Sequence, residues 1–559
     1  MARGYQTAII YVLSFIVLLL AMPRDLYVFD EGIILLDAMR VLNGEIIHRD
    51  FYANYGPGQY YALAALFATF GKSFMVERLF DIAERAAGLA TLFYVVRQVS
   101  PFKFSLAVTA LGGMWMIFTL MSPLYPVFPC IPLSIIGAYL LTRAARLAFP
   151  IWRVGLAGAT AGAAALFRYD VGFLVFVAHI LSLTFLVYLN EPPGRRTRRW
   201  LRAVVAYGAG TALAFAPAAI LLLVTGAIPG FIGDIIDFSA RYYRRMRNLP
   251  FPGFEVYPND IVRWGVYFPI LAVALSALPL LSSLRSLRWR RPEERASIDY
   301  YAAFGILSGL LFFKGVVRAV PLHMTLAIIP SLIVFALVLK GWWRQGVALR
   351  IAAFALGLVI FLPSANGMKQ EIGHSYRVGD RSIAQWLAIR AGLISARAAP
   401  ACVEAPNTGI AQISPDYVRI ANFIDAFSRP DERILVAVDH HDRLGWNAAS
   451  LYFIARRLPE TRWAQFDPGL QTRADIQSAM IDELDHGSVR WVVQDGEIAP
   501  PDEPNESSLS SGVTLLDDYL KKNYHPVAYA GKVSLLLKNG ETLQRIAPGS
   551  PDCEAELVK

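Results

Sequence analysis

Apolar stretches long enough to cross a lipid bilayer recur through the first 363 residues of this 559-residue chain. The hydrocarbon core of a bilayer is about 30 Å thick, and a helix needs about 20 residues to cross it. Because no water enters that core, the backbone must satisfy its own hydrogen bonds there, and a helix does so within one segment. The chain is 55% hydrophobic and 17% charged, whereas soluble domains have about 25% charged residues. The sequence therefore predicts a polytopic α-helical membrane protein.

Arginine-rich loops predict how the helices are oriented. The loop 191–202, EPPGRRTRRWLR, lies between two apolar runs, and a second basic stretch follows at 285–295. The positive-inside rule assigns both to the cytoplasm, and this charge pattern favours membrane orientation over nucleic-acid binding. Counting outward from these loops gives about eleven membrane helices, with the N-terminus inside and the residues after Pro363 outside. The first run, 7–22, is predicted to be retained, because no small-residue cleavage site precedes Asp30.

Residues 1–363 are thus expected to form a transmembrane domain with an outer juxtamembrane loop at 23–77. Within that loop, the apolar stretch 58–70 is too short to span a bilayer and is interpreted as an interfacial or re-entrant helix. The segment 32–43 has apolar residues at helical spacing, which predicts a second juxtamembrane helix.

Residues 364–559 are predicted to form a soluble, extracytoplasmic α/β domain. Short apolar runs alternate with amphipathic stretches there, which is typical of a layered α/β arrangement. The expected strands are 433–439, 489–495 and 532–538, and the expected helices are 448–458, 475–487 and 515–524. We find no glycine-rich phosphate loop in this part of the sequence.

The sequence shows no clear metal signature. The pattern DHHDR at 439–443 places two adjacent histidines after a strand, and such neighbours rarely converge on one ion. No cofactor is certain from the sequence, and whether a divalent metal binds near a carboxylate such as Asp170 is left open. Of the three cysteines, Cys130 lies in an apolar run and is interpreted as a packing residue. Cys402 and Cys553 lie in the C-terminal domain, and whether they pair is left open.

Two adjacent carboxylates, Asp30 and Glu31, follow the first membrane run. They could simply begin the helix at Gly32, because carboxylates favour helix N-termini. However, charged residues also gather at the predicted outer ends of several other spans. These are Arg49, Asp50, Arg78, Asp81, Glu84, Arg85, Arg168, Asp170, Arg241, Arg244, Arg245, Arg318 and His323. Acids together with arginines favour a base that works beside an anionic, phosphate-bearing group.

The segment YVFDEGIILLDAMRVLNGEIIHRDFYANYGPGQYYALAALFATFG, residues 27–71, resembles the start of the GT-C glycosyltransferases. It is most similar to the protein mannosyltransferase type that uses dolichyl-phosphate-mannose and to the bacterial lipid A aminoarabinose transferase type. The resemblance covers about the first 100 residues by motif and the rest only by architecture. It implies a GT-C-like fold in the bacterial inner membrane, with the active site on the periplasmic face. It also implies an inverting transfer of a sugar from a polyprenyl-phosphate donor.

By the same resemblance, Asp30 matches the catalytic acid and would act as general base on the acceptor hydroxyl. Glu31 would orient the acceptor or partner arginines. The candidates for binding the donor phosphate or other parts of the substrates are Arg168, Asp170, Arg245, Arg318, His323, Tyr55, Gln59 and Arg85. Where relatives often have lysine or histidine before paired prolines, this chain has NYGPGQYY, so Tyr55 and Gln59 stand at that position.

Simpler roles exist for several candidates. One alternative is that Arg168 and Asp170 simply pair with each other to stabilise an outer turn, and another is that His323 is an interfacial histidine. The helical spacing of 81–85 would suit an intrahelical network. The basic run 241–247 would also suit lipid headgroups.

Two other functions are weighed against the enzyme. A transporter or flippase for lipid or polysaccharide should break its spans near the middle of the bilayer, whereas the charges here lie at the ends of spans. A membrane scaffold would not need clustered acids and arginines. The sequence does not name the sugar, the lipid carrier, the oligomeric state, or the acceptor, which is a glycan, a lipid or a protein.

Overall fold

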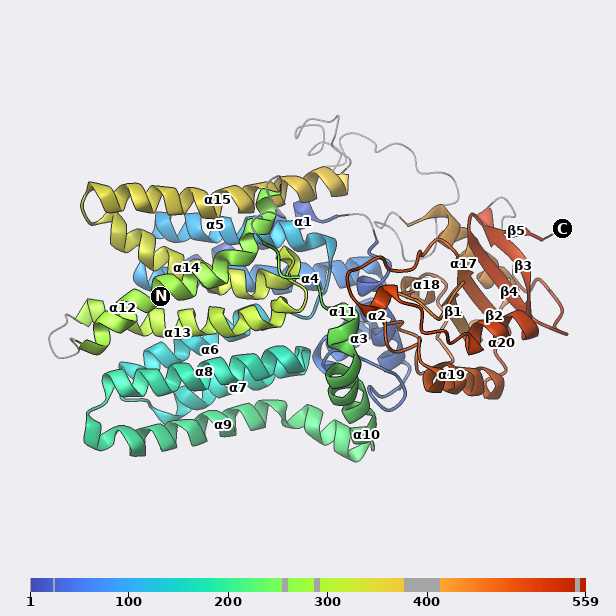
Figure 1. The fold of residues 1–559 in the computed structure, drawn as a ribbon, viewed down its shortest axis with the longest axis horizontal. Helices are drawn as coiled ribbons and strands as arrows, with labels where there is room; N and C mark the ends of the chain where they lie inside the picture. The colour runs from blue at the N-terminus through green and yellow to red at the C-terminus, as the bar shows by residue number, and fades with distance from the viewer. Residues whose placement is uncertain are drawn as a thin grey trace.

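A computed structural model describes residues 2–23, 26–253, 260–285, 292–376, 413–547 and 553–558. Long helices lie side by side at one end of the molecule, and a sheet with its helices lies at the other (Figure 1). Short helices and loops fill the region between these two parts. The fold class expected from the sequence, a helical membrane protein with a C-terminal α/β domain, is confirmed.

The membrane part is a helical bundle. Its helices are α1 (Ala2–Ala21), α4 (Phe74–Val99), α5 (Phe102–Phe118), α6 (Cys130–Ala145), α7 (Ile151–Phe167), α8 (Tyr169–Asn190), α9 (Pro193–Val224), α12 (Phe268–Arg285), α13 (Pro292–Val316), α14 (Pro321–Trp343) and α15 (Val347–Tyr376). Among the described residues, seven of these are long and apolar enough to cross a membrane, namely α1, α8, α9, α12 with the preceding turn, α13, α14 and α15. The helices α5, α6 and α7 are apolar but shorter. The expected number of about eleven crossings and their orientation stay predictions.

Two helices have unusual surroundings for their composition. In the most apolar 18-residue stretch of α14, 83% of the residues are buried. The helix packs against α12, α13 and α15, so α14 forms the centre of the bundle. The helix α4 carries several charges yet packs against α1, α5 and α6. Its charged side chains are therefore enclosed by protein rather than by lipid.

Short elements cover the end of the bundle that faces the sheet. They are α2 (Asp30–Leu42), α3 (Pro57–Phe70), η1 (Thr119–Met121), α10 (Ile228–Phe231), the π-helical turns η2 (Ile232–Asp237) and η3 (Ser239–Tyr243), α11 (Arg244–Arg247) and η5 (Ile261–Tyr267). The two expected juxtamembrane helices are thus confirmed as helices. A Cβ built at Gly56 would lie 2.2 Å from the carbonyl oxygen of Leu166, so only glycine lets the chain before α3 approach the end of α7 this closely.

The C-terminal domain contains a five-stranded sheet in the order β1-β2-β4-β3-β5. The strands are β1 (Ile434–Val438), β2 (Trp491–Asp495), β3 (Tyr524–Ala530), β4 (Val533–Lys538) and β5 (Glu556–Leu557). The pair β1 and β2 is parallel, with Val436 opposite Val493, and the other pairs are antiparallel. The accompanying helices are α17 (Pro415–Phe427), α18 (Ser450–Ile454), α19 (Ala474–His486), η7 (Glu506–Ser508) and α20 (Leu515–Asn523).

The expected strands β1, β2 and β4 and the expected helices α19 and α20 are confirmed. The helix expected at 448–458 is shorter, covering only α18. The helix α15 continues past Pro363, the expected end of the membrane domain, to Tyr376. Cys130 is buried and free, as expected for a packing residue. Cys553 is disulfide-bonded, whereas Cys402 lies outside the described residues, so whether these two cysteines pair stays an open question.

The C-terminal domain packs directly on α2. The amide of Ser450 donates to the carbonyl of Val28 at 3.1 Å, and the guanidinium of Arg40 donates to the carbonyl of Thr461 at 3.1 Å. A Cβ built at Gly32 would lie 2.3 Å from the amide nitrogen of Ser450. This close approach of two backbones holds the start of α2 between the bundle and the domain.

Candidate active site

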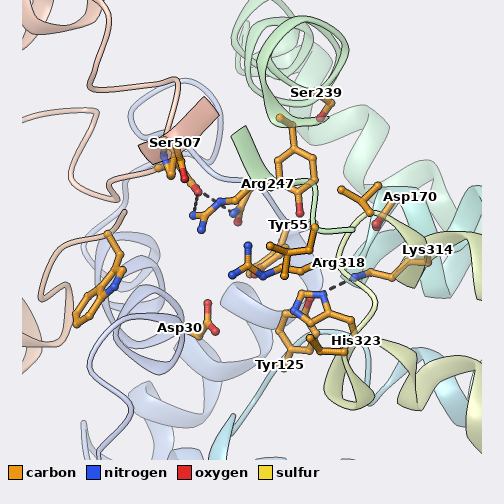
Figure 2. Close-up of a pocket in the computed structure, with 18 of the residues that line it drawn as sticks. Asp30, Tyr55, Tyr125, Asp170, Ser239, Arg247, Lys314, Arg318, His323 and Ser507 are labelled. Carbon is orange, nitrogen blue, oxygen red and sulfur yellow. Dashed lines mark hydrogen bonds and ion pairs between the residues drawn. The ribbon is translucent and has the colours of Figure 1, made fainter. Parts of the chain in front are cut away.

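A cavity of about 840 Å³ lies where the end of the bundle, the short elements and the C-terminal domain meet (Figure 2). Its wall includes the first residue of α2, the turn between α7 and α8, the turn between α13 and α14, and loops of the C-terminal domain. The acidic, basic and histidine residues that line it are Asp30, Arg168, Asp170, Asp234, Arg247, Lys314, Arg318, His323, Asp467, Asp502 and Glu503. The cavity therefore carries both signs of charge.

Asp30 is the first residue of α2 and is half-buried at the cavity wall. In the part of the chain that the structure describes, its carboxylate makes no hydrogen bond and no ion pair. Burial raises the pKa of the Asp30 carboxyl to about 6, against the opposing effect of the Arg247 guanidinium. A carboxylate with such a pKa and no partner is suited to accept a proton near neutral pH.

Three arginines of the cavity have carboxylate partners. These pairs are Arg168 with Asp170, Arg247 with Asp467, and Arg318 with Glu503. The first pair bridges the turn before α8 and is bidentate, with two N–O distances of 3.0 Å. The other two pairs join the bundle side of the cavity to loops of the C-terminal domain, so they also hold the domain in place.

Lys314, near the end of α13, differs from the three arginines. Its ammonium donates to the hydroxyl of Tyr125 at 3.3 Å, and among the described residues no carboxylate oxygen lies within 4.0 Å of it. Tyr125 also accepts from Arg168 at 3.0 Å, and its ring lies 5.9 Å from that of His323. In Figure 2, Lys314 and His323 point into the side of the cavity across from Asp30. Lys314 is therefore a cation available to a bound anion.

Two aromatic rings contact the guanidinium of Arg168. The guanidinium of Arg168 lies over the ring of Tyr55, 4.7 Å from its centroid, and 5.3 Å from that of Tyr125. Such cation–π contacts fix the planar group without neutralising it. Tyr55 thus contacts the guanidinium of Arg168 from the aromatic stretch after α2.

Asp234 joins three segments at the cavity wall. Its carboxylate lies 2.9 Å from Nδ1 of His48 and accepts from Arg462 of the C-terminal domain at 2.9 Å. The Nε2 of His48 lies 3.3 Å from the hydroxyl of Tyr169, the first residue of α8. Burial raises the pKa of Asp234, and the contact with His48 opposes this shift. The cluster connects the juxtamembrane loop, η2 and the domain.

Of the candidate residues predicted from the sequence, six line the cavity. They are Asp30, Tyr55, Arg168, Asp170, Arg318 and His323. The other four, Glu31, Gln59, Arg85 and Arg245, do not line it. Asp30 and Glu31 separate because neighbouring residues on a helix point about 100° apart. Glu31 is buried toward α4, 2.7 Å from the guanidinium of Arg78, and accepts from the amide of Tyr27 at 2.9 Å.

The remaining three have other surroundings. Gln59 donates to Glu84 at 3.2 Å inside the protein. Arg85 is fully buried, 2.8 Å from Asp81, and also donates to three backbone carbonyls of the segment 116–122. Arg245 is exposed on α11 and lines a separate groove, with Glu503 shared between that groove and the cavity.

Sequence reasoning missed several residues of the cavity. Arg247 belongs to a basic run whose members look alike in the sequence, and Lys314 lies at the end of a predicted span. Tyr125 lies in the proline-rich turn after α5, which was the only signal for it. Asp467 and Trp446 come from loops of the C-terminal domain, and no local pattern connects them to the membrane part.

No metal site is found among the described residues, where no three His, Cys, Asp or Glu side chains lie close enough to share an ion. His441 lies 2.6 Å from Asp517, while the neighbouring His440 pairs with Asp439, so the two histidines point to different partners. Both oxygens of Asp170 accept from Arg168. These residues do not fit a divalent metal, and no step of the chemistry below involves one.

Comparison with known proteins gives structural matches only. No protein-family model and no curated protein sequence matches the chain. ArnT from Cupriavidus metallidurans bound to undecaprenyl phosphate aligns with 96% of this chain and 98% of its own, at 14% identity and a TM-score of 0.49. The archaeal oligosaccharyltransferase AglB from Archaeoglobus fulgidus, in complex with an inhibitory peptide and a dolichol-phosphate, covers 88% of this chain and 70% of its own, at 11% identity and a TM-score of 0.41. With TM-scores below 0.5, these likenesses support no step of the functional argument, which rests on the cavity. Both proteins are GT-C membrane glycosyltransferases, the class that residues 27–71 of this chain resemble.

Proposed function

We propose that the chain is an inverting glycosyltransferase that moves a sugar from a polyprenyl-phosphate donor to an acceptor hydroxyl on the outer face of the membrane. The observation that carries this proposal is the carboxylate of Asp30. It has no partner among the described residues, and its pKa is raised to about 6. It faces a cavity that Arg168 also lines and into which Lys314 points from the side across from Asp30. A base and a cationic group across one cavity are what a displacement with a phosphate leaving group requires.

In the proposed reaction, Asp30 accepts the proton of the acceptor hydroxyl. The hydroxyl oxygen attacks the anomeric carbon of the donor sugar from the side opposite the phosphate. The bond between that carbon and the phosphate oxygen breaks, and the electron pair leaves with the lipid phosphate. The product therefore has the inverted anomeric configuration, and the proton remains on Asp30 until it passes to solvent.

Lys314 and Arg168 would stabilise the leaving phosphate. Negative charge grows on the phosphate oxygens as the bond breaks, and donors already in position stabilise that charge most. Lys314 is a compact point charge without a carboxylate partner, whereas the guanidinium of Arg168 would share its donors with Asp170, its bidentate partner. The paired Arg318 would contribute only by sharing its donors with Glu503.

The position of the cavity suits a lipid-linked donor. It is lined by Phe173 of α8 and Phe313 of α13, whose side chains are 66% and 63% exposed on the outside of these apolar helices. The two helices pack together, so a polyprenyl chain that leaves the cavity beside them would enter lipid directly. The charged residues lie at helix ends, with Arg168 before α8 and Arg318 before α14, whereas a transporter would need them near mid-span.

The test is the variant Asp30→Asn, purified and assayed for release of free polyprenyl phosphate from a panel of polyprenyl-phosphate sugars. Asn keeps the shape of the side chain but cannot accept the proton, so we expect a loss of about 10²-fold or more. Asp237→Asn is the matched control, because the side chain of Asp237 is 40% exposed and does not line the cavity. Thermal melting establishes that both variants fold. Wild-type rates in the folded Asp30→Asn variant would refute the proposal.

A further inference from the structure

A second concave region lies at the opposite end of the bundle, between α5, α14 and α15. It is a groove of about 520 Å³. Its walls are mostly apolar and include Phe104, Leu339, Phe354 and Leu358, while Lys340 and Arg344 are its charged residues. No residue of the candidate active site contributes to it.

The groove lies about one membrane thickness away from the active-site cavity. His323, near the start of α14, lines the cavity, and Trp343, at the end of the same helix, lines the groove. At 1.5 Å per residue, these positions are about 30 Å apart along the helix axis, which is about the thickness of the hydrocarbon core. Figure 1 shows the turn between α14 and α15 at the end of the bundle away from the sheet. The groove therefore lies at the other membrane surface.

The charged residues in the two segments that line the groove are all basic. The segments 97–104 and 339–358, which contain its lining residues, include five basic residues and no acid, namely Arg97, Lys103, Lys340, Arg344 and Arg350. Lys340 donates to the carbonyl of Val99. Arg344 is exposed, and its side chain makes no hydrogen bond or ion pair within the described residues. The rim thus has positive charge that no carboxylate of these segments neutralises.

Two further features match a lipid molecule. Trp343, 60% exposed at the rim, is the residue type that gathers at headgroup level. Gly357 of α15 lines the groove, and a Cβ built there would meet no atom within 4 Å. The groove is therefore open space beside an apolar helix, with no part of the described chain filling it at this point.

We propose that this groove binds an anionic phospholipid of the surrounding membrane. One acyl chain lies against Phe104, Phe354 and Leu358, and the phosphate is attracted by Arg344 and Lys340. A zwitterionic lipid would fill the same apolar walls, but its headgroup carries no net charge for the rim, so the groove prefers the anionic lipid. This site is independent of the proposed glycosyl transfer.

The experiment measures lipid binding to the purified full-length chain by native mass spectrometry. The probes are phosphatidylglycerol and phosphatidylcholine with identical acyl chains. We expect wild type to retain phosphatidylglycerol in preference to phosphatidylcholine. Arg344→Gln should weaken phosphatidylglycerol binding about fivefold, the effect of one basic residue near a lipid surface, and leave phosphatidylcholine unchanged.

A second variant fills the groove. Gly357→Leu places a side chain in the open space, where its Cβ meets no protein atom within 4 Å, so the fold should persist while both lipids lose the site. The matched controls are Gly208→Leu and Arg198→Gln on α9. A Cβ at Gly208 likewise meets nothing within 4 Å, and Arg198 is exposed outside the groove. Equal binding of both lipids to wild type, unchanged binding in Gly357→Leu, or equal losses in the α9 controls would each overturn the proposal.

Discussion

Two groups of charged residues, one lining the cavity and the other buried inside the protein, differ in what surrounds them. In the cavity, Asp30 has no partner in the described structure, and Lys314 has only a tyrosine hydroxyl. On α2 and α4, the charged side chains of Glu31, Arg78 and Arg85 are buried, and each is engaged by an oppositely charged side chain or by the backbone. Buried charges with partners hold structure together, whereas charges left unpaired beside a cavity indicate chemistry.

The largest effect is expected from the buried group. Arg85→Met should lower the free energy of unfolding by about 3–5 kcal/mol, because it leaves Asp81 as a buried charge without its partner and removes the donors of several backbone carbonyls. Thermal or denaturant melting in detergent measures this loss. Arg49→Met is the control, because its pair with Asp50 is exposed and should contribute less than about 1 kcal/mol. Equal losses in both variants would remove the distinction between the two groups.

The next largest effect is expected on catalysis, from a residue that lines the cavity. Lys314→Gln should lower kcat/KM for the lipid-phosphate donor by about 10²–10³-fold, the usual cost of removing one group that stabilises developing charge. Its melting temperature should stay near that of wild type, because no carboxylate oxygen of the described residues lies within 4.0 Å of the lysine. The control is Lys103→Gln, since Lys103 is exposed on α5 and away from the cavity. A stability loss without a catalytic loss would make Lys314 a structural residue.

The sequence predicted the two groups unequally. Asp30 and Arg168 were found because charges beside apolar runs are costly unless they are used. Glu31 and Arg85 were found by the same signal, but helical geometry turns them into the protein, and the sequence pattern does not reveal which face meets the cavity. Asp467, which binds Arg247, is brought to the site only by the packing of the C-terminal domain.

The strands of the C-terminal domain show the same limit of prediction from local sequence patterns. Apolar runs predicted β1, β2 and β4 because these strands are largely buried. The strand β3 was missed, since it alternates in exposure and contains Pro526, beside which its register with β4 shifts. Proline in a strand is typical of such irregular positions, and local patterns do not distinguish them from a loop.

The two adjacent carboxylates themselves should respond to neutralisation in opposite directions. The pKa of Asp30 in the folded protein is about 6, above its ordinary value of 3.8, so the folded state binds more protons than the unfolded state between these values. Stability therefore falls as the pH rises through this window. Asp30→Asn should raise the melting temperature at pH 7, and this gain should shrink as the pH falls toward 4.

Burial raises the pKa of the Glu31 carboxyl too, against the opposing effect of the Arg78 guanidinium. Glu31→Gln should nevertheless lower the free energy of unfolding by about 1.5–3 kcal/mol, because the substitution removes the charged acceptor 2.7 Å from the buried guanidinium of Arg78. Melting curves of both variants at several pH values test the contrast. It would be contradicted if both substitutions shifted the melting temperature in the same direction at pH 7.

The smallest effect is expected at the rim of the cavity, where the two kinds of surroundings meet. In the pair of Arg318 and Glu503, both side chains are about one quarter exposed, so solvent screens their attraction. Glu503→Gln should therefore cost about 0.2–1 kcal/mol of stability, and added salt should reduce the difference from wild type. The variant also frees the Arg318 guanidinium for the donor phosphate, so KM for the donor should fall a few-fold. Glu506→Gln, an exposed neighbour that does not line the cavity, is the control. A stability loss as large as that of Arg85→Met would place this pair with the buried structural charges rather than with the site.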